Sequence, residues 1–170
     1  MLAYIKMIEV GPVPNVKGGL AMLNRSKKAG YLAMGRYWFT HLRLQHFTNA
    51  AARRYNYAPR EGDPGRPDPH GFEASYRGQK LKEQGHTRPL EKTGESQSQT
   101  NTANITATSK HVRLSMAAGW IGVHGGGHKI DMEEEFTAID QRDADELAEA
   151  FTTDARRAYL REVGQAIELL

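Results

Sequence analysis

Residues 26–47, SKKAGYLAMGRYWFTHLRLQHF, decide the fold because their apolar side chains recur every three or four positions. This spacing puts the side chains on one face of an α-helix and predicts the main core helix of the chain. Ser26 can cap this helix. Lys27 and Lys28 oppose the helix dipole at that end, so a start nearer Lys17 stays open. The apolar stripe consists of Tyr31, Leu32, Met34, Trp38, Phe39 and Leu42.

The segments on either side of this helix have a different character. Residues 2–10, LAYIKMIEV, alternate loosely and end at Gly11-Pro12, which predicts a short strand closed by a turn. Residues 58–73 hold four of the seven prolines and three glycines, a density that excludes helix interiors and central strands. We therefore expect a long loop over 58–85, and loops of that length are usually functional or ordered by a partner.

Three strand-like segments follow and predict an antiparallel β-meander over 96–139. Residues 96–108 are polar on both faces, and Val112, Leu114 and Met116 alternate cleanly. Residues 130–138 place Ile130, Met132, Phe136 and Ala138 on one side. The glycine-rich link over 117–128 predicts a mobile hairpin tip.

The C-terminal segment predicts a second helix over 141–168. Asp143 with Glu146 three residues later resembles a capping box, and a narrow apolar stripe follows: Ala144, Leu147, Phe151, Ala155 and Ala158. The fold class is therefore α+β, with an antiparallel sheet packed against a long helix from the N-terminal half and a C-terminal helix. Long loops or hairpin arms complete it. At 170 residues we expect one domain, residues 1–170.

Composition favours a protein that is contacted by other subunits. Only 39% of the residues are hydrophobic, and the mean hydropathy is −0.65. Residues 1–130 hold 19 Lys and Arg against 8 Asp and Glu, whereas residues 131–170 hold 4 against 12. Such a chain can attract a copy of itself or present a basic face to nucleic acid. No segment resembles a signal peptide or a membrane span, so we expect a soluble protein.

The sequence offers little for catalysis. Cysteine is absent, and no nucleophile elbow or zinc-protease motif occurs. A zinc or nickel site is one interpretation of His111, His124 and His128 with the acidic Glu133 to Glu135. Three glycines separate the last two histidines, so fixing these ligands would cost conformational entropy. We therefore expect no enzyme, no cofactor and no metal.

A basic and aromatic cluster supplies the candidate contacts for a partner. Its positive side chains can bind phosphates and its tyrosines can stack on bases. The positive electrostatic potential is reduced by acidic residues between them: Glu61, Asp63, Asp68, Glu73 and Glu83. A protein partner is therefore favoured over nucleic acid, which stays the alternative. The candidates are Arg53, Arg54, Tyr55, Tyr57, Arg60, Tyr76, Arg77, Lys80 and Lys82, with Arg88 nearby.

The order of these features resembles the virion-morphogenesis, neck and tail-completion proteins of tailed bacteriophages. The resemblance covers about residues 45–165 and is carried by FTNAAARRYNYAPR from Phe47, YRGQKLKEQGHTRPLEKTGES from Tyr76, and MEEEFTAIDQRDADELAEAF from Met132. The core element of that family, Pro-Leu, two residues, Thr-Gly, matches Pro89, Leu90, Thr93 and Gly94 here. The Pro-rich stretch within 58–73 and the N-terminal strand depart from the shared pattern.

The resemblance implies a non-enzymatic, ring-forming subunit at the neck or the top of the tail, made in the bacterial cytoplasm and located in the virion. Its implied partners are copies of itself, a head connector or stopper, and the tail tube or tail terminator, with genome DNA in the lumen left open. At the corner, we expect Pro89 to set the turn, Leu90 to anchor it in the core and Gly94 to permit the backbone reversal.

Overall fold

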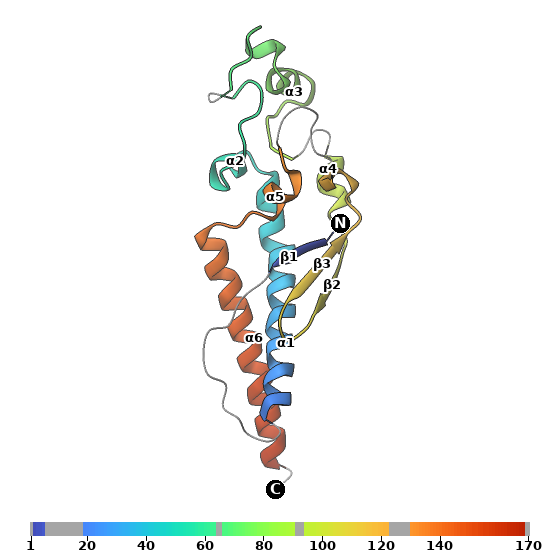
Figure 1. Ribbon diagram of the computed structural model, residues 1–170, viewed down its shortest axis with the longest axis vertical. Coiled ribbons are helices and arrows are strands. Elements are labelled where there is room, and N and C mark those ends of the chain that lie inside the picture. The colour runs from blue at the N-terminus through green and yellow to red at the C-terminus, as the bar shows by residue number, and fades with distance from the viewer. Residues whose placement is uncertain (1, 6–18, 64–65, 91–93, 123–129, 169–170) are drawn as a thin grey trace. The chain divides into compact units, whose positions relative to one another are not determined.

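The computed structural model describes residues 2–5, 19–63, 66–90, 94–122 and 130–168 (Figure 1). Their internal contacts divide the chain into two compact units, where the sequence led us to expect one domain. Unit 1 holds Arg43–Thr102 and Ala117–Asp140, and unit 2 holds Leu2–Leu42, Ala103–Met116 and Gln141–Leu170. Mixed helix and strand make the chain an α+β protein, as predicted.

The sheet of unit 2 is antiparallel and has the strand order β1-β3-β2. Its strands are β1 (Leu2–Ile5), β2 (Ala103–Ala107) and β3 (Val112–Met116). Leu114 of β3 lies opposite Ala3 on one side and Ile105 on the other. The prediction that 130–138 forms the third strand is wrong, because the N-terminal strand takes that place beside β3.

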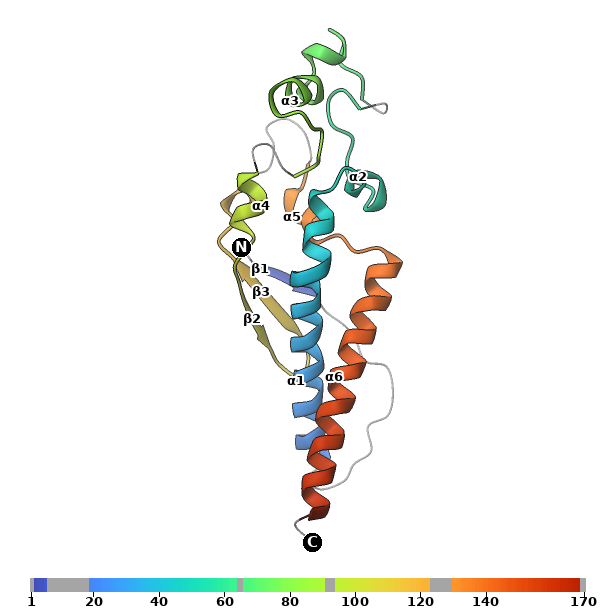
Figure 2. The same cartoon turned by 180° about the vertical axis from the view of Figure 1, so that it is seen from behind.

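Helix α1 (Gly19–Tyr37) covers one face of this sheet, and α6 (Gln141–Glu168) packs along the other side of α1 (Figure 1). Figure 2 shows the same layers from behind. Two glycines permit this close packing. A Cβ at Gly35 would lie 2.5 Å from Cγ2 of Val112, and one at Gly30 would lie 2.8 Å from the backbone oxygen of Phe151. Larger side chains would therefore push α1 away from both neighbours.

Helix α1 begins at Gly19, so Ser26 is not its N-cap as expected. Ser26 lies inside the helix, where its buried hydroxyl donates to the carbonyl oxygen of Met22 at 3.0 Å. The alternative of an earlier start is the one observed. Beyond Tyr37 the chain continues as a π-helical turn, Trp38–Leu42, and a 3-10 turn, Arg43–Phe47. The predicted helix therefore stays helical to Phe47, but its last two turns are not α-helical.

The C-terminal helix has the predicted bounds. Leu147 is buried, and the ring of Phe151 meets Tyr31 edge-on at 4.9 Å between centroids. Asp143 lies in the first turn of the helix rather than before it, so it does not serve as the predicted N-cap. The core of unit 2 also buries Met34, Val112 and Leu114.

Unit 1 is built from short helices joined by long connections. They are α2 (Ala51–Arg54), the 3-10 turn η3 (Phe72–Ala74), α3 (Tyr76–Gln84), α4 (Glu95–Gln99), the 3-10 turn η4 (Gly119–Gly122) and α5 (Met132–Thr137). The expected loop over 58–85 therefore ends in a helix. Ser75 starts it, because its Oγ accepts from the backbone N–H of Gly78 at 3.0 Å.

The predicted meander over 96–139 is wrong at both ends. Its first segment begins as α4 and becomes a strand only at Ala103. Its last segment is α5, because the Asp131 carboxylate accepts from the backbone N–H groups of Glu133 and Glu134 at 2.9 and 3.0 Å. Acidic side chains also suit the first turn of a helix. The expected hairpin tip is a 3-10 turn over Gly119–Gly122, and 123–129 lie outside the described residues.

The core of unit 1 is aromatic. Phe136 is fully buried, and its ring lies 5.8 Å from that of Phe47 and 5.4 Å from that of Trp120. Such tilted and edge-on pairs contribute beyond their buried area. Among the described residues, no helix has the length and apolar content to cross a membrane.

Candidate functional site: a cationic pocket on unit 1

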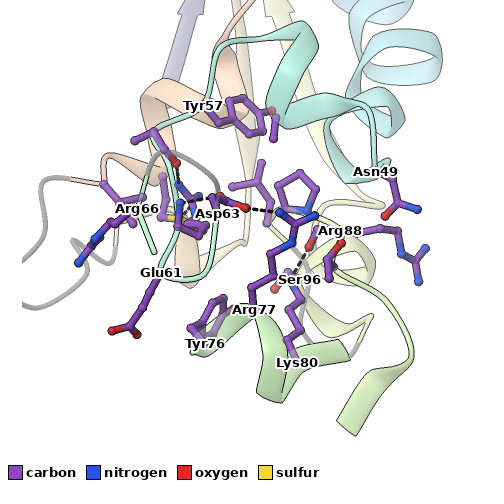
Figure 3. A pocket seen from close by; sticks show the side chains of 18 of the residues that line it. Asn49, Tyr57, Glu61, Asp63, Arg66, Tyr76, Arg77, Lys80, Arg88 and Ser96 are labelled. Atoms are coloured by element: carbon purple, nitrogen blue, oxygen red, sulfur yellow. Dashed lines mark hydrogen bonds and ion pairs between the residues drawn. The ribbon is translucent and has the colours of Figure 1, made fainter. Parts of the chain in front are cut away.

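Unit 1 carries a pocket of about 660 Å³, which we call the cationic pocket (Figure 3). Its size lies within the range of ligand-binding and side-chain-binding sites, about 300 to 1,000 Å³. Apolar side chains line part of it: Pro89, Leu90, Trp120, Ile130 and Met132. Five cationic side chains line the rest: Arg60, Arg66, Arg77, Lys80 and Arg88.

The Pro-Leu corner of the predicted family element forms one wall. Leu90 is 6% exposed and adopts a φ of 55°, a left-handed conformation that non-glycine residues rarely take. Gly94 follows with a φ of 85° and begins α4. Leu90 is therefore buried, as expected, and Gly94 has a backbone conformation that glycine adopts readily. Thr93 lies outside the described residues.

Arg60 is held in place by the acidic helix α5. Its guanidinium binds Glu135 through two contacts of 2.5 and 2.7 Å, and Glu135 also accepts the backbone N–H of Ala58 at 3.1 Å. The Glu135 side chain is only 8% exposed, so its carboxylate has lost most of its hydration. The two parallel hydrogen bonds from the Arg60 guanidinium compensate much of that loss. The pair joins the basic segment to the acidic one within a single unit.

Two further arginines are held by carboxylates in the same unit. Arg77 lies 2.5 Å from Asp63, whose other oxygen accepts the backbone N–H of Arg60 at 2.7 Å. Arg54 lies 2.8 Å from Asp140. Part of the charge asymmetry that the sequence shows is therefore neutralised inside the chain. Figure 3 shows Arg77 pointing toward Asp63, while Glu61 extends away from them.

Lys80 is a buried cation in the pocket wall. It is 4% exposed, its Nζ donates to the carbonyl oxygen of Arg88, and it lies 5.7 Å from the centroid of the Tyr76 ring. A cation at this distance from an aromatic ring is attracted by the ring face. Tyr76 itself is 43% exposed, so the pocket rim offers an aromatic surface next to positive charge.

Tyr57 connects the pocket to a buried histidine. Its hydroxyl lies 2.5 Å from Nδ1 of His46, and the His46 ring stacks on Tyr55 at 4.3 Å between centroids. Burial, and secondarily the charge of Arg54, lower the pKa of His46 to about 4. His46 was not among the predicted site residues, although its position four residues after Leu42 on the apolar stripe is a signal for burial.

The structure brings together five of the nine predicted contact residues. Tyr57, Arg60, Tyr76, Arg77 and Lys80 all line the cationic pocket. The other four do not: Tyr55 is buried, Arg54 binds Asp140, and Arg53 and Lys82 are exposed on α2 and α3. Arg66 and Trp120 also line the pocket but were not among the predicted contact residues.

The comparisons with known proteins do not indicate a function for this chain. No family model, no curated protein and no solved structure matches this chain. Of the metal constellation considered above, His124 and His128 lie outside the described residues, and no group of three potential ligands gathers among the described ones. Chemically, the pocket is suited to an occupant that combines a negative charge with an apolar body.

Proposed function

We propose that this chain is a structural virion subunit of a tailed bacteriophage, a ring-forming neck or tail-completion protein that joins the head connector to the tail. The family resemblance supplies the class of protein. The structural support is one observation: both units expose large apolar side chains on well-formed helices and turns. Exposed apolar groups that gather in patches mark sites of association.

On unit 1 the exposed side chains surround α3. Phe72, Tyr76 and Leu81 are 46%, 43% and 42% exposed. On unit 2 they lie in the first turn of α1 and toward the end of α6, where Leu20, Tyr159 and Leu160 are 54%, 43% and 56% exposed. A subunit with neighbours on several sides, as in stacked rings, would cover such separate groups of exposed side chains.

The sheet of unit 2 adds a second kind of contact surface. β2 lies at the edge of the β1-β3-β2 order, and its Asn104 and Thr106 side chains are exposed. An edge strand offers backbone N–H and C=O groups to another chain. Uncharged polar side chains on it do little to prevent such pairing.

The nucleic-acid alternative has weaker support from the geometry. Arg54, Arg60 and Arg77 already bind Asp140, Glu135 and Asp63. A phosphate would compete with these carboxylates for the same donors.

Purified virions test the proposal. A structural subunit is expected in the virion at a fixed copy number, in density at the head-to-tail junction, and deletion of its gene should leave heads and tails unjoined. Virions that lack the protein and still infect would contradict the proposal.

A further inference from the structure

We infer that the cationic pocket receives the exposed Phe72–Glu73 turn of a second copy of this chain, and that this contact repeats from copy to copy around a ring. The inference rests on the proposed function, because it names the partner of the pocket within the assembly. Pocket and turn both belong to unit 1, so each copy carries both halves of the contact.

The dimensions of the pocket favour a short segment as its occupant. One turn of α-helix with side chains is about 5.4 Å long and about 11 Å wide, so it fills roughly 500 Å³. The pocket of about 660 Å³ would hold little more than that one turn. A short turn that projects one aromatic and one charged side chain fits better than a face of α6.

The charge of the pocket selects an acidic occupant. Five cationic side chains line it, and three carboxylates lie on or against it: Glu61 and Asp63 in the lining and Glu135 bound to Arg60, which leaves a formal excess of two positive charges. Its apolar side, formed by Pro89, Leu90 and Trp120 among others, requires an aromatic or aliphatic group as well. An aromatic side chain next to a carboxylate satisfies both conditions.

Among the described residues, the Phe72–Glu73 turn is the segment that meets these conditions. Phe72 is 46% exposed, and Glu73 is exposed and makes no ion pair with any residue the structure describes. Ile139 is also exposed beside an acid, but the neighbouring Asp140 already binds Arg54. Tyr159 and Leu160 precede Glu162, which binds Arg25.

Hydrogen bonds hold the backbone of this turn, while the Phe72 and Glu73 side chains are exposed. Ser75 Oγ donates to the Phe72 carbonyl at 2.5 Å and accepts from the N–H of Gly78 at 3.0 Å. A Cβ at Gly78 would lie 1.9 Å from the same carbonyl oxygen, so only glycine allows the turn to rest on α3. A preorganised aromatic anchor binds with less loss of conformational entropy than a mobile one.

Cysteine cross-linking tests the contact directly, because the chain has no cysteine of its own. Ala74→Cys sits on the turn and leaves Phe72 and Glu73 intact, and Asn49→Cys sits on the pocket wall at an exposed position. Under mild oxidation, the doubly substituted chain is expected to form a ladder of covalent oligomers. The matched control, Ala74→Cys with Thr152→Cys on the exposed face of α6, is expected to give none. Equal ladders from both, or products that stop at the dimer, would overturn the inference.

Charge reversal provides a second readout in the full-length chain. Phe72→Ala is expected to lower the self-association constant about 30-fold or more, as loss of an interface anchor does. Glu73→Arg and Arg88→Glu should each weaken association, and their combination should recover most of it. Circular dichroism and urea midpoints establish that each variant is folded.

The inference and the proposed function can fail separately. If the chain forms rings in the virion but Phe72→Ala assembles normally, the contact is wrong and the structural role stands. If Arg88→Glu weakens association and Phe72→Ala does not, another occupant fills the pocket and the inference is overturned. A chain that stays monomeric at every concentration and yields no disulfide also overturns it.

Discussion

The Tyr57 hydroxyl lies 2.5 Å from Nδ1 of His46, and the imidazole is fully buried beneath the wall of the cationic pocket. Burial lowers the pKa of His46 in the folded chain to about 4, from 6.5 for an ordinary histidine. Because the unfolded chain takes up the proton first, stability is complete above about pH 6.5 and falls as the pH drops toward 4.

Lowering the pH from 7 to 5 is therefore expected to reduce the free energy of unfolding by about 2 kcal/mol through His46 alone. Urea unfolding at the two pH values measures the loss. His46→Gln should be less stable at pH 7 but should lose less on acidification, whereas His70→Gln, at an exposed loop position, should behave like the parent chain. An unchanged acid response in His46→Gln would show that other groups carry it.

The buried pair between Arg60 and Glu135 is expected to be sensitive to the loss of one partner. Glu135→Ala leaves the Arg60 guanidinium and the Ala58 N–H without their acceptor, which destabilises by about 3 to 5 kcal/mol for a buried pair. Arg157→Ala, which removes the exposed pair with Asp154, should change the urea midpoint little. Similar effects of the two substitutions would contradict the importance of burial here.

Gly35 in α1 and Gly164 in α6 give opposite predictions for the same substitution. Gly35→Ala puts a methyl group 2.5 Å from Val112 and 3.0 Å from Ile105, so overpacking of about 1 to 3 kcal/mol outweighs the gain in helix propensity. Gly164→Ala in α6 meets nothing within 4 Å and should stabilise by up to about 1 kcal/mol. Thermal unfolding of both variants tests the packing of α1 on the sheet. Stabilisation by Gly35→Ala would be incompatible with that packing.

Salt dependence separates the two candidate functions. For a structural subunit, we expect at most weak binding to single-stranded DNA, and this binding should disappear near physiological salt. The Arg53→Glu, Lys82→Glu double variant should bind the DNA with nearly the same affinity as the parent chain. A nucleic-acid-binding protein would show a steep log–log slope of about −0.7 for each phosphate contacted. Fluorescence anisotropy over a salt series makes the measurement, and nanomolar binding at physiological salt would favour the alternative.

Local patterns predicted the two long helices because their signals lie within neighbouring residues. Spacings of three and four around Tyr31, Met34 and Trp38 require only the helix itself, and the same holds for Leu147 and Phe151 in α6. The segment around Met132 and Phe136 was wrongly predicted as a strand. A spacing of four residues puts two side chains on the same side of a strand and also on the same side of a helix. The cap of Asp131 on the backbone of Glu133 and Glu134 resolves this ambiguity.

Gly30 and Gly35 have a role that the local sequence does not indicate. Within the sequence, a glycine in a helix weakens it, and nothing nearby indicates why it is there. In the structure, Gly30 meets Phe151 and Gly35 meets Val112, residues more than 70 positions away along the chain. Their role depends on packing partners that local propensity cannot identify.

The amino-acid sequence by itself determined the α+β class, the two long helices, the buried Leu90 corner and the basic and aromatic composition of the segment around it. Those properties follow from the spacing and backbone preferences of neighbouring residues. Only the tertiary structure decided that β1 pairs with β3, that Arg60 is held by Glu135, and that Tyr57, Tyr76 and Trp120 share one pocket. Pairings between distant segments depend on which surfaces bury apolar area and satisfy charge together, and this is a property of the whole folded chain.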